Sequence, residues 1–95
     1  MPSQPPIERR RVQFIGRVQG VGFRATARSI ARSQPISGWV KNEPDGSVLL
    51  EAQGEPVAIE AFLSDLRQRM GRLIKTESAC AAPIVAAETG FEVRY

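Results

Sequence analysis

The sequence contains no histidine and a single cysteine. The lack of histidine excludes every catalytic triad that uses an imidazole base, and most zinc sites. Because Cys80 has no partner in the chain, an internal disulfide is impossible, which suits a reducing compartment. We expect Cys80 to be a small buried hydrophobe. A metal site would need carboxylates alone, and none are clustered for it, so we predict no metal and no cofactor.

The sequence also lacks a long apolar run, so we expect no membrane span and no membrane partner. The first residues contain no apolar signal-peptide core. We therefore predict a disordered N-terminal lead over residues 1–8, followed by one small domain over 9–95. We expect the protein to be a cytoplasmic monomer.

Positive charge is concentrated in the first half of the chain. Residues 1–50 carry eight Lys or Arg against three Asp or Glu, a difference of +5, whereas 51–95 carry five against seven, a difference of −2. The excess suits an anionic ligand or nucleic acid, although ordinary solvated surface is the simpler explanation of the count alone. Three consecutive arginines, Arg9 to Arg11, could form a nucleic-acid patch, but we expect them at the outer edge of a strand.

Apolar spacing predicts an alternation of strands and helices. The expected elements are a strand over 9–16, a helix over 23–32, strands over 36–42 and 47–53, a helix opened by 54–56 and ended by Gly71, a strand over 74–82 and a short final strand over 91–95. This order is typical of an α+β fold, the ferredoxin-like two-layer sandwich (βαββαβ). It predicts an antiparallel sheet with two helices on one face and a short C-terminal edge strand.

A glycine-rich stretch, Gly16 to Arg24 (GRVQGVGFR), joins the first strand to the first helix. Gly20 and Gly22 permit backbone angles closed to other residues, so several N–H groups can turn toward one small anion. Arg24 falls in the first helical turn, where the helix dipole also favours an anion. We interpret the stretch as a phosphate-binding loop. Arg28 and Arg32 follow Arg24 at intervals of four residues, so the three arginines lie on one side of the helix. We expect Arg28 and Arg32 to form a solvated face.

Asn42 ends the second strand. Because a crossover helix makes its flanking strands parallel, the C-terminal ends of 9–16 and 36–42 lie at one edge of the sheet. With the third strand between them, these ends would be about 10 Å apart. A carboxamide can accept a hydrogen bond from water through its oxygen while its NH2 group donates to a second oxygen. Taken alone, Asn42 would be a turn residue before Pro44; opposite an anion loop, a functional role is favoured.

Two motifs together resemble the acylphosphatase family: Gly16 to Arg24, and Gly38 to Asn42 (GWVKN) followed by Asp45 to Val48 (DGSV). The resemblance covers about residues 10–95. It implies the ferredoxin-like fold and hydrolysis of the carboxyl–phosphate bond of acyl phosphates to a carboxylate and inorganic phosphate, without a metal. It also implies that Arg24 binds the phosphate and Asn42 orients the attacking water. The phosphate-binding backbone amides are then those of Gln19, Gly20, Val21, Gly22, Phe23 and Arg24.

The resemblance makes a small-molecule acyl phosphate the expected substrate, and inorganic phosphate or sulfate the expected bound anion. One alternative is an RNA-binding module, since ferredoxin-like sheets also bind RNA through exposed aromatics. Phe14 is expected to face the core and Trp39 alone is a poor stacking platform, so we expect no nucleic-acid partner. A second alternative keeps the loop without the catalysis, as a phosphate-sensing or carbamoyl-phosphate-processing unit, although Arg24 and Asn42 are both intact.

Overall fold

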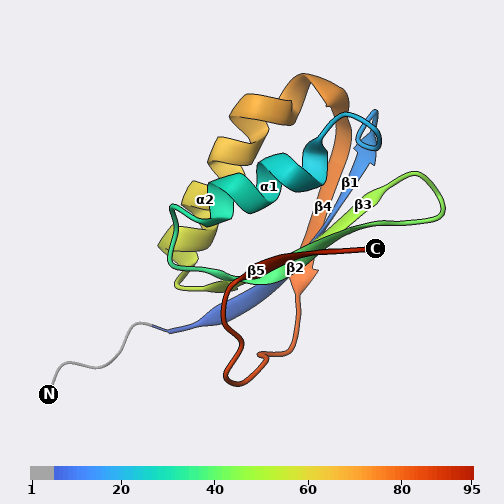
Figure 1. Cartoon of the computed structure of the whole chain (residues 1–95). Coiled ribbons are helices and arrows are strands. Elements are labelled where there is room, and N and C mark those ends of the chain that lie inside the picture. The colour runs from blue at the N-terminus through green and yellow to red at the C-terminus, as the bar shows by residue number, and fades with distance from the viewer. Residues whose placement is uncertain (1–5) are drawn as a thin grey trace, which may run out of the picture.

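The computed structural model describes residues 6–95 and has two layers, a five-stranded sheet with two helices packed on one face (Figure 1). The elements are, in chain order, β1 (Glu8–Gly16), α1 (Phe23–Ala31), β2 (Ser37–Asn42), β3 (Val48–Gly54), α2 (Pro56–Met70), the 3-10 helix η1 (Gly71–Leu73), β4 (Ile74–Ala81) and β5 (Phe91–Arg94). The predicted order of elements and the α+β, ferredoxin-like class are confirmed. Of the predicted lead over 1–8, residues 1–5 lie outside the described residues, and β1 already begins at Glu8.

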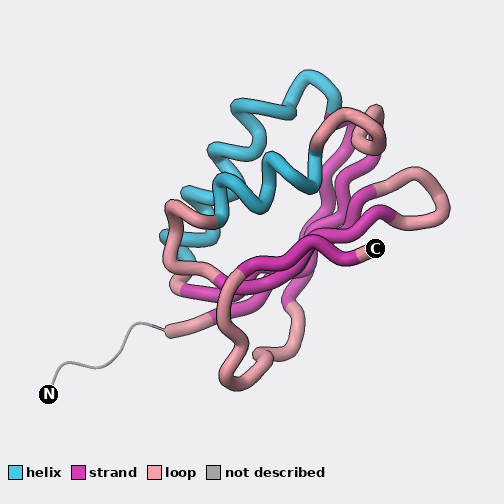
Figure 2. The backbone as a smooth tube through the Cα atoms, in the orientation of Figure 1, coloured by secondary structure: helices cyan, strands magenta, loops and turns pink. Residues whose placement is uncertain are grey.

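The strands run in the order β4-β1-β3-β2-β5 across the sheet. β1 and β2 are each antiparallel to β3, which lies between them, so β1 and β2 are parallel to each other. β5 is the short edge strand that the sequence predicts, and it pairs with β2 in parallel. Figure 2 shows the strands as one twisted layer with both helices on the same side. The loop after β1 and the turn after β2 therefore lie at one edge of the sheet.

The core fills the space between the sheet and the helices. Val12 and Phe14 alternate onto the helix-facing side of β1 and are fully buried, as is Leu50 on β3. The predicted apolar faces of both helices are buried as well. The rings of Phe14 and Phe23 are 5.0 Å apart between centroids, so the first residue of α1 is packed directly onto β1. This contact fixes the start of α1 beneath the glycine loop.

α2 is ended by Gly71, as the sequence predicts, but without the left-handed cap that glycine often forms. Gly71 follows the last residue of the helix, and its φ of −58° remains right-handed helical. The chain therefore continues into η1 before β4 begins at Ile74. Within residues 6–95, no helix is long and apolar enough to cross a membrane.

Two expectations about polar residues are wrong. Cys80 is exposed rather than buried, because it lies on the edge strand β4 opposite Arg11, on the sheet face that the helices do not cover. Arg9 to Arg11 are not at the edge of the sheet either, because β1 is bordered by β3 and β4. The sequence could not reveal this, since strand order depends on distant pairing.

Arg9 is buried at the centre of an ionic network on the outer face of the sheet. Its side chain is 1% exposed and forms ion pairs with Glu51 on β3 and, at 2.6 Å, with Glu88 in the loop between β4 and β5. Arg11 pairs with the other oxygen of Glu51 at 2.6 Å. Ser37 donates a hydrogen bond to Glu88 at 2.8 Å. This network attaches the β4–β5 loop to the sheet and so sets where β5 begins.

We expect Arg9→Met to lower the free energy of unfolding by about 3–5 kcal/mol, because the change leaves two partly buried carboxylates without their shared cation. Arg11→Met is the matched control. The Arg11 side chain is 50% exposed, and its loss should cost about 1 kcal/mol or less. Urea unfolding of both variants measures the difference, and equal losses would contradict a central role for Arg9.

The same network predicts a loss of stability in acid. Burial acts to raise the pKa of Glu51, but hydrogen bonds and charge from Arg9 and Arg11 outweigh it and hold the pKa below its ordinary value. The pKa of Glu88 is lowered in the same way by Arg9 and Ser37. A lowered folded-state pKa stabilises the protein above the unfolded value of about 4.3, and this contribution is lost as the pH falls further. Below about pH 4.3 the free energy of unfolding should fall more steeply for the unaltered protein than for Glu51→Gln; parallel profiles would contradict the assignment.

Candidate active site

The glycine loop between β1 and α1 adopts the backbone conformation that the sequence predicts. Gly20 and Gly22 have φ values of +74° and +80°, in the left-handed region that favours glycine. A Cβ at either position would meet no atom within 4 Å, so the conformation and not a lack of space requires glycine. Gly22 is the N-cap of α1. Arg24 is therefore the second residue of the helix, next to a loop whose turns are typical of an anion-binding concavity.

The loop is held in place by the side chain of Gln19. Its amide Nε2 donates to the carbonyl oxygen of Glu43 at 2.8 Å and to that of Ser47 at 2.9 Å. These two carbonyls belong to the turn between β2 and β3, immediately after Asn42. Gln19 thus links the glycine loop to the segment that carries Asn42. Sequence reasoning assigned Gln19 only a backbone role, because neither periodicity nor spacing identifies a partner 24 residues away.

Arg24 extends from α1 toward the C-terminal end of the chain. Its Cζ lies 4.8 Å from the ring centroid of Tyr95, and its Nη1 donates to the carbonyl oxygen of Arg94 at 3.4 Å. Among residues 6–95, no carboxylate forms an ion pair with Arg24. Its remaining N–H donors are therefore available to an anion.

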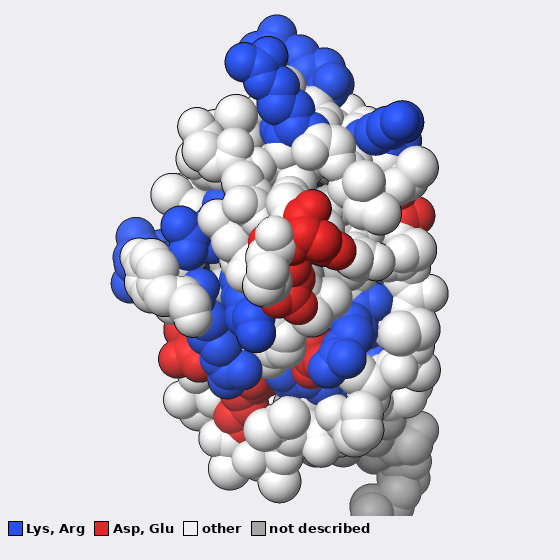
Figure 3. Space-filling view, turned by 90° about the vertical axis from the view of Figure 1, so that its right-hand side faces the viewer, with Lys and Arg blue, Asp and Glu red and all other residues white. Residues whose placement is uncertain are grey.

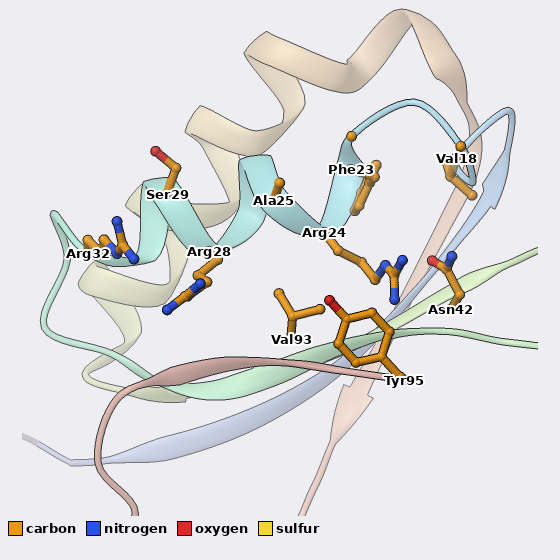
Figure 4. Close-up of a pocket in the computed structure, with 12 residues that line it drawn as sticks. Val18, Phe23, Arg24, Ala25, Arg28, Ser29, Arg32, Asn42, Val93 and Tyr95 are labelled. Carbon is orange, nitrogen blue, oxygen red and sulfur yellow. The ribbon is translucent and has the colours of Figure 1, made fainter.

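Asn42 is the last residue of β2 and pairs with Val48 on β3. Its side-chain oxygen Oδ1 is buried and has no hydrogen-bond partner within the described part of the chain. Such an atom is rare, because a buried acceptor without a partner costs about 1–3 kcal/mol. Figure 4 shows the carboxamide of Asn42 and the guanidinium of Arg24 pointing toward each other. The unpaired oxygen is thus placed where a ligand or a water could satisfy it.

The side chains of Arg24 and Asn42 line one hollow of about 360 Å³, which is also lined by Gly20, Gly22 and Tyr95. Phe23, at the start of α1, lines it too, whereas two other residues of the predicted loop set do not. The side chain of Gln19 bonds to the β2–β3 turn, and Val21 packs against the core.

Arg28 and Arg32 were expected to be a solvated face apart from the site. They are exposed, but both line the same hollow as Arg24. The lining includes no Asp or Glu, so all of its charged side chains are arginines. Figure 3 views the molecule from the side of the glycine loop and the β2–β3 turn, where basic groups lie at the top, the left and below the centre, and acidic groups lie at the centre, the lower left and the right edge. Residues 6–95 contain no cluster of three or more His, Cys, Asp or Glu placed to hold a metal ion.

Comparison with known proteins gives one family. Residues 10–93 match the acylphosphatase family. An acylphosphatase from Clostridium acetobutylicum is 42% identical over 91 residues, which cover 94% of this chain and 99% of that protein. An acylphosphatase from Oceanobacillus iheyensis is 39% identical over 87 residues, which cover 90% and 96%. The crystal structure of acylphosphatase from Bacillus subtilis superposes with a TM-score of 0.82 and 27% identity, covering 95% of this chain and 100% of that chain.

The fold and these matches define a hydrolase that acts on acid anhydrides of phosphate. The chain belongs to the acylphosphatase family, and it hydrolyses small-molecule acyl phosphates. The family and the activity that the two sequence motifs imply are thereby confirmed.

The hydrogen bonds from Gln19 to the β2–β3 turn predict that Gln19→Leu lowers the hydrolysis rate. The variant keeps the approximate shape of the side chain but removes both hydrogen bonds, each of which contributes about 1 kcal/mol. We expect kcat/KM for benzoyl phosphate to fall about tenfold, because the loop and Asn42 lose their common anchor. Gln13→Leu is the control. Gln13 also bonds to the β2–β3 turn, through Ser47 Oγ at 3.2 Å, but from the strand rather than the loop. Equal rates in the two variants would contradict the anchoring role.

Proposed function

We propose a separate role for each residue of this site in the hydrolysis of an acyl phosphate. The transferred phosphate is held by the guanidinium of Arg24 and by backbone amides of the glycine loop; the attacking water is oriented by Asn42. The phosphate-binding amides are those of Gln19, Gly20, Val21, Gly22, Phe23 and Arg24. The observation that carries this proposal is the buried, unpaired Oδ1 of Asn42 in the hollow that Arg24 also lines.

The role of Arg24 follows from its shape and surroundings. A guanidinium presents a planar fork of donors that matches two oxygens of one phosphate. Stacking on Tyr95 and the bond to the carbonyl of Arg94 restrict the side chain without neutralising its charge. Little freedom is then lost when the anion binds. Phosphoryl transfer depends mainly on such positioning and on stabilisation of charge on the equatorial oxygens.

The role of Asn42 follows from its unpaired acceptor. Oδ1 accepts a hydrogen bond from the water, which turns a lone pair of the water oxygen toward phosphorus. The new bond forms between the water oxygen and phosphorus, and the bond from phosphorus to the acyl oxygen breaks. The carboxylate leaves with the electron pair of that bond. It is a good leaving group and requires no acid.

No protein side chain acts as the base in this scheme; a phosphate oxygen of the substrate takes the proton from the water. The two nearest carboxylates in sequence both have other contacts. Glu43 lies 3.7 Å from the ammonium of Lys41. Asp45 accepts the N–H and the hydroxyl of Ser47 at 2.9 and 2.6 Å, and these bonds lower its pKa and keep it ionised within the turn.

We further propose that inorganic phosphate, the product, or sulfate occupies the loop when no substrate is present. We also propose a monomer in the cytoplasm. The exposed thiol of Cys80 suits a compartment that keeps cysteines reduced.

Arg24→Ala and Asn42→Ala should separate binding from rate. Arg24→Ala removes a direct ligand of the phosphate, so both phosphate affinity and kcat should fall. Asn42→Ala removes only the contact with water, so kcat should fall roughly a hundred- to a thousandfold, which corresponds to about 3–4 kcal/mol, while phosphate still binds. Titration with inorganic phosphate and turnover of benzoyl phosphate measure the two effects. Equal loss of phosphate affinity in both variants would refute the separate roles of Arg24 in phosphate binding and Asn42 in orienting water.

Glu43→Gln tests the absence of a protein base. The substitution removes the carboxylate but keeps its size, and the backbone carbonyl that Gln19 binds is unchanged. We expect kcat for benzoyl phosphate to stay within about twofold, because general-base catalysis contributes roughly a hundred- to ten-thousandfold where it operates. A loss in that range with the fold intact would show that Glu43 takes the proton.

A further inference from the structure

Three arginines on one stripe of α1 line the active-site hollow, but the hydrolysis derived above uses only the first. Arg28 and Arg32 are exposed, and neither forms an ion pair with any residue within 6–95. Both nevertheless line the hollow that contains Arg24 and Asn42, whose lining includes no Asp or Glu side chain. In Figure 4 the side chains of Arg24 and Arg28 extend from the same side of α1, toward β5.

The spacing of these arginines is unfavourable unless an anion is present. Like charges four residues apart on a helix repel each other and destabilise it. Elsewhere in the described chain, Arg67 on α2 pairs with Glu77 on β4, and the half-buried Arg10 pairs with Glu60, whereas the exposed Arg17 and Arg72 form no ion pair and line no part of the hollow. The stripe on α1 forms no ion pair within the described residues either. Its charge is thus available to whatever occupies the hollow.

The phosphate at Arg24 cannot satisfy the whole stripe. With a rise of 1.5 Å per residue, Arg28 and Arg32 lie about 6 and 12 Å further along the axis of α1 than Arg24. With the phosphate at Arg24, the far part of the hollow is open to the acyl group of the substrate. Between the two arginines and the phosphate site, the hollow is lined by Val93, which is half-buried, and by the ring of Tyr95. A short carbon skeleton can lie against these two side chains.

We propose that the preferred substrates are acyl phosphates whose acyl group carries a second anion, such as a carboxylate, at the end remote from the phosphate. Arg28 is the principal contact of this second anion, and Arg32 adds to the attraction. The inference rests on the proposed binding of the transferred phosphate by Arg24 and the glycine loop. It assigns a specificity role to Arg28 and Arg32 and no part in the chemical step.

The test compares two probes of nearly the same shape. In para-carboxybenzoyl phosphate the ring carries a carboxylate opposite the acyl phosphate, and in para-carbamoylbenzoyl phosphate it carries a neutral amide. The quantity measured is the ratio of kcat/KM for the charged probe to that for the neutral probe. Because any difference in intrinsic reactivity between the probes is the same for every variant, a change in this ratio reports on the protein alone.

We expect this ratio to fall on the order of fivefold in Arg28→Gln, and further in the double variant with Arg32→Gln. Arg72→Gln is the matched control, because Arg72 is exposed, makes no ion pair within the described residues and does not line the hollow. It removes the same charge and should leave the ratio unchanged. Raising the salt from about 0.01 M to about 1 M shortens the screening length from ~30 to ~3 Å and should reduce the preference of the unaltered enzyme.

The outcomes separate this inference from the proposed function. If Arg28→Gln and Arg72→Gln give the same ratio as the unaltered enzyme while benzoyl phosphate is still hydrolysed, the second-anion site is refuted and the roles of Arg24 and Asn42 stand. If Arg24→Ala retains full phosphate affinity and rate, the proposed phosphate site itself is refuted. A fall in the ratio for Arg28→Gln alone supports the second-anion site.

Discussion

The active site depends on one constraint, the position of β3 between two parallel strands. β1 and β2 each pair with β3 in antiparallel register, so both end at the same edge of the sheet. β1 ends in the glycine loop and β2 ends in Asn42. The bonds from Gln19 to the turn after β2 then join the two ends directly. The strand order therefore brings Gly20 and Asn42 together at one hollow. Without it, the loop alone would form only a turn of the anion-binding kind.

The helix and the C-terminus complete the site from the other side. Packing of Phe23 on Phe14 sets the start of α1, and with it the origin of the Arg24 side chain. β5 adds to the sheet beside β2 and brings Tyr95 and the carbonyl of Arg94 onto the guanidinium. The buried pairing of Arg9 with Glu88 holds the loop that leads into β5. An ionic network on the outer face of the sheet thus contributes to the position of Arg24, the proposed phosphate ligand, on the opposite face.

Local patterns predicted most of the fold, and long-range contacts account for what they missed. The alternation around Phe14 and the helical spacing after Phe23 correctly predicted β1 and α1, because an element buried on one face has apolar residues at regular intervals. The two motifs indicated Arg24 and Asn42. The sequence did not predict the contact of Tyr95 with Arg24 or the burial of Arg9, because each requires strands that are distant in the chain to pair in a particular order. The exposure of Cys80 follows from the same order, which leaves β4 at an edge.

The central claim is that Asn42 directs a water molecule at phosphorus while the loop and Arg24 hold the phosphate. Hydrolysis of benzoyl phosphate in water labelled with the heavy oxygen isotope tests this claim most directly, because the label records which atom the water attacks. The account predicts that the label appears in inorganic phosphate and that the benzoate remains unlabelled. Label in the benzoate would mean that water attacks the carbonyl carbon, and it would contradict the proposed roles of both residues.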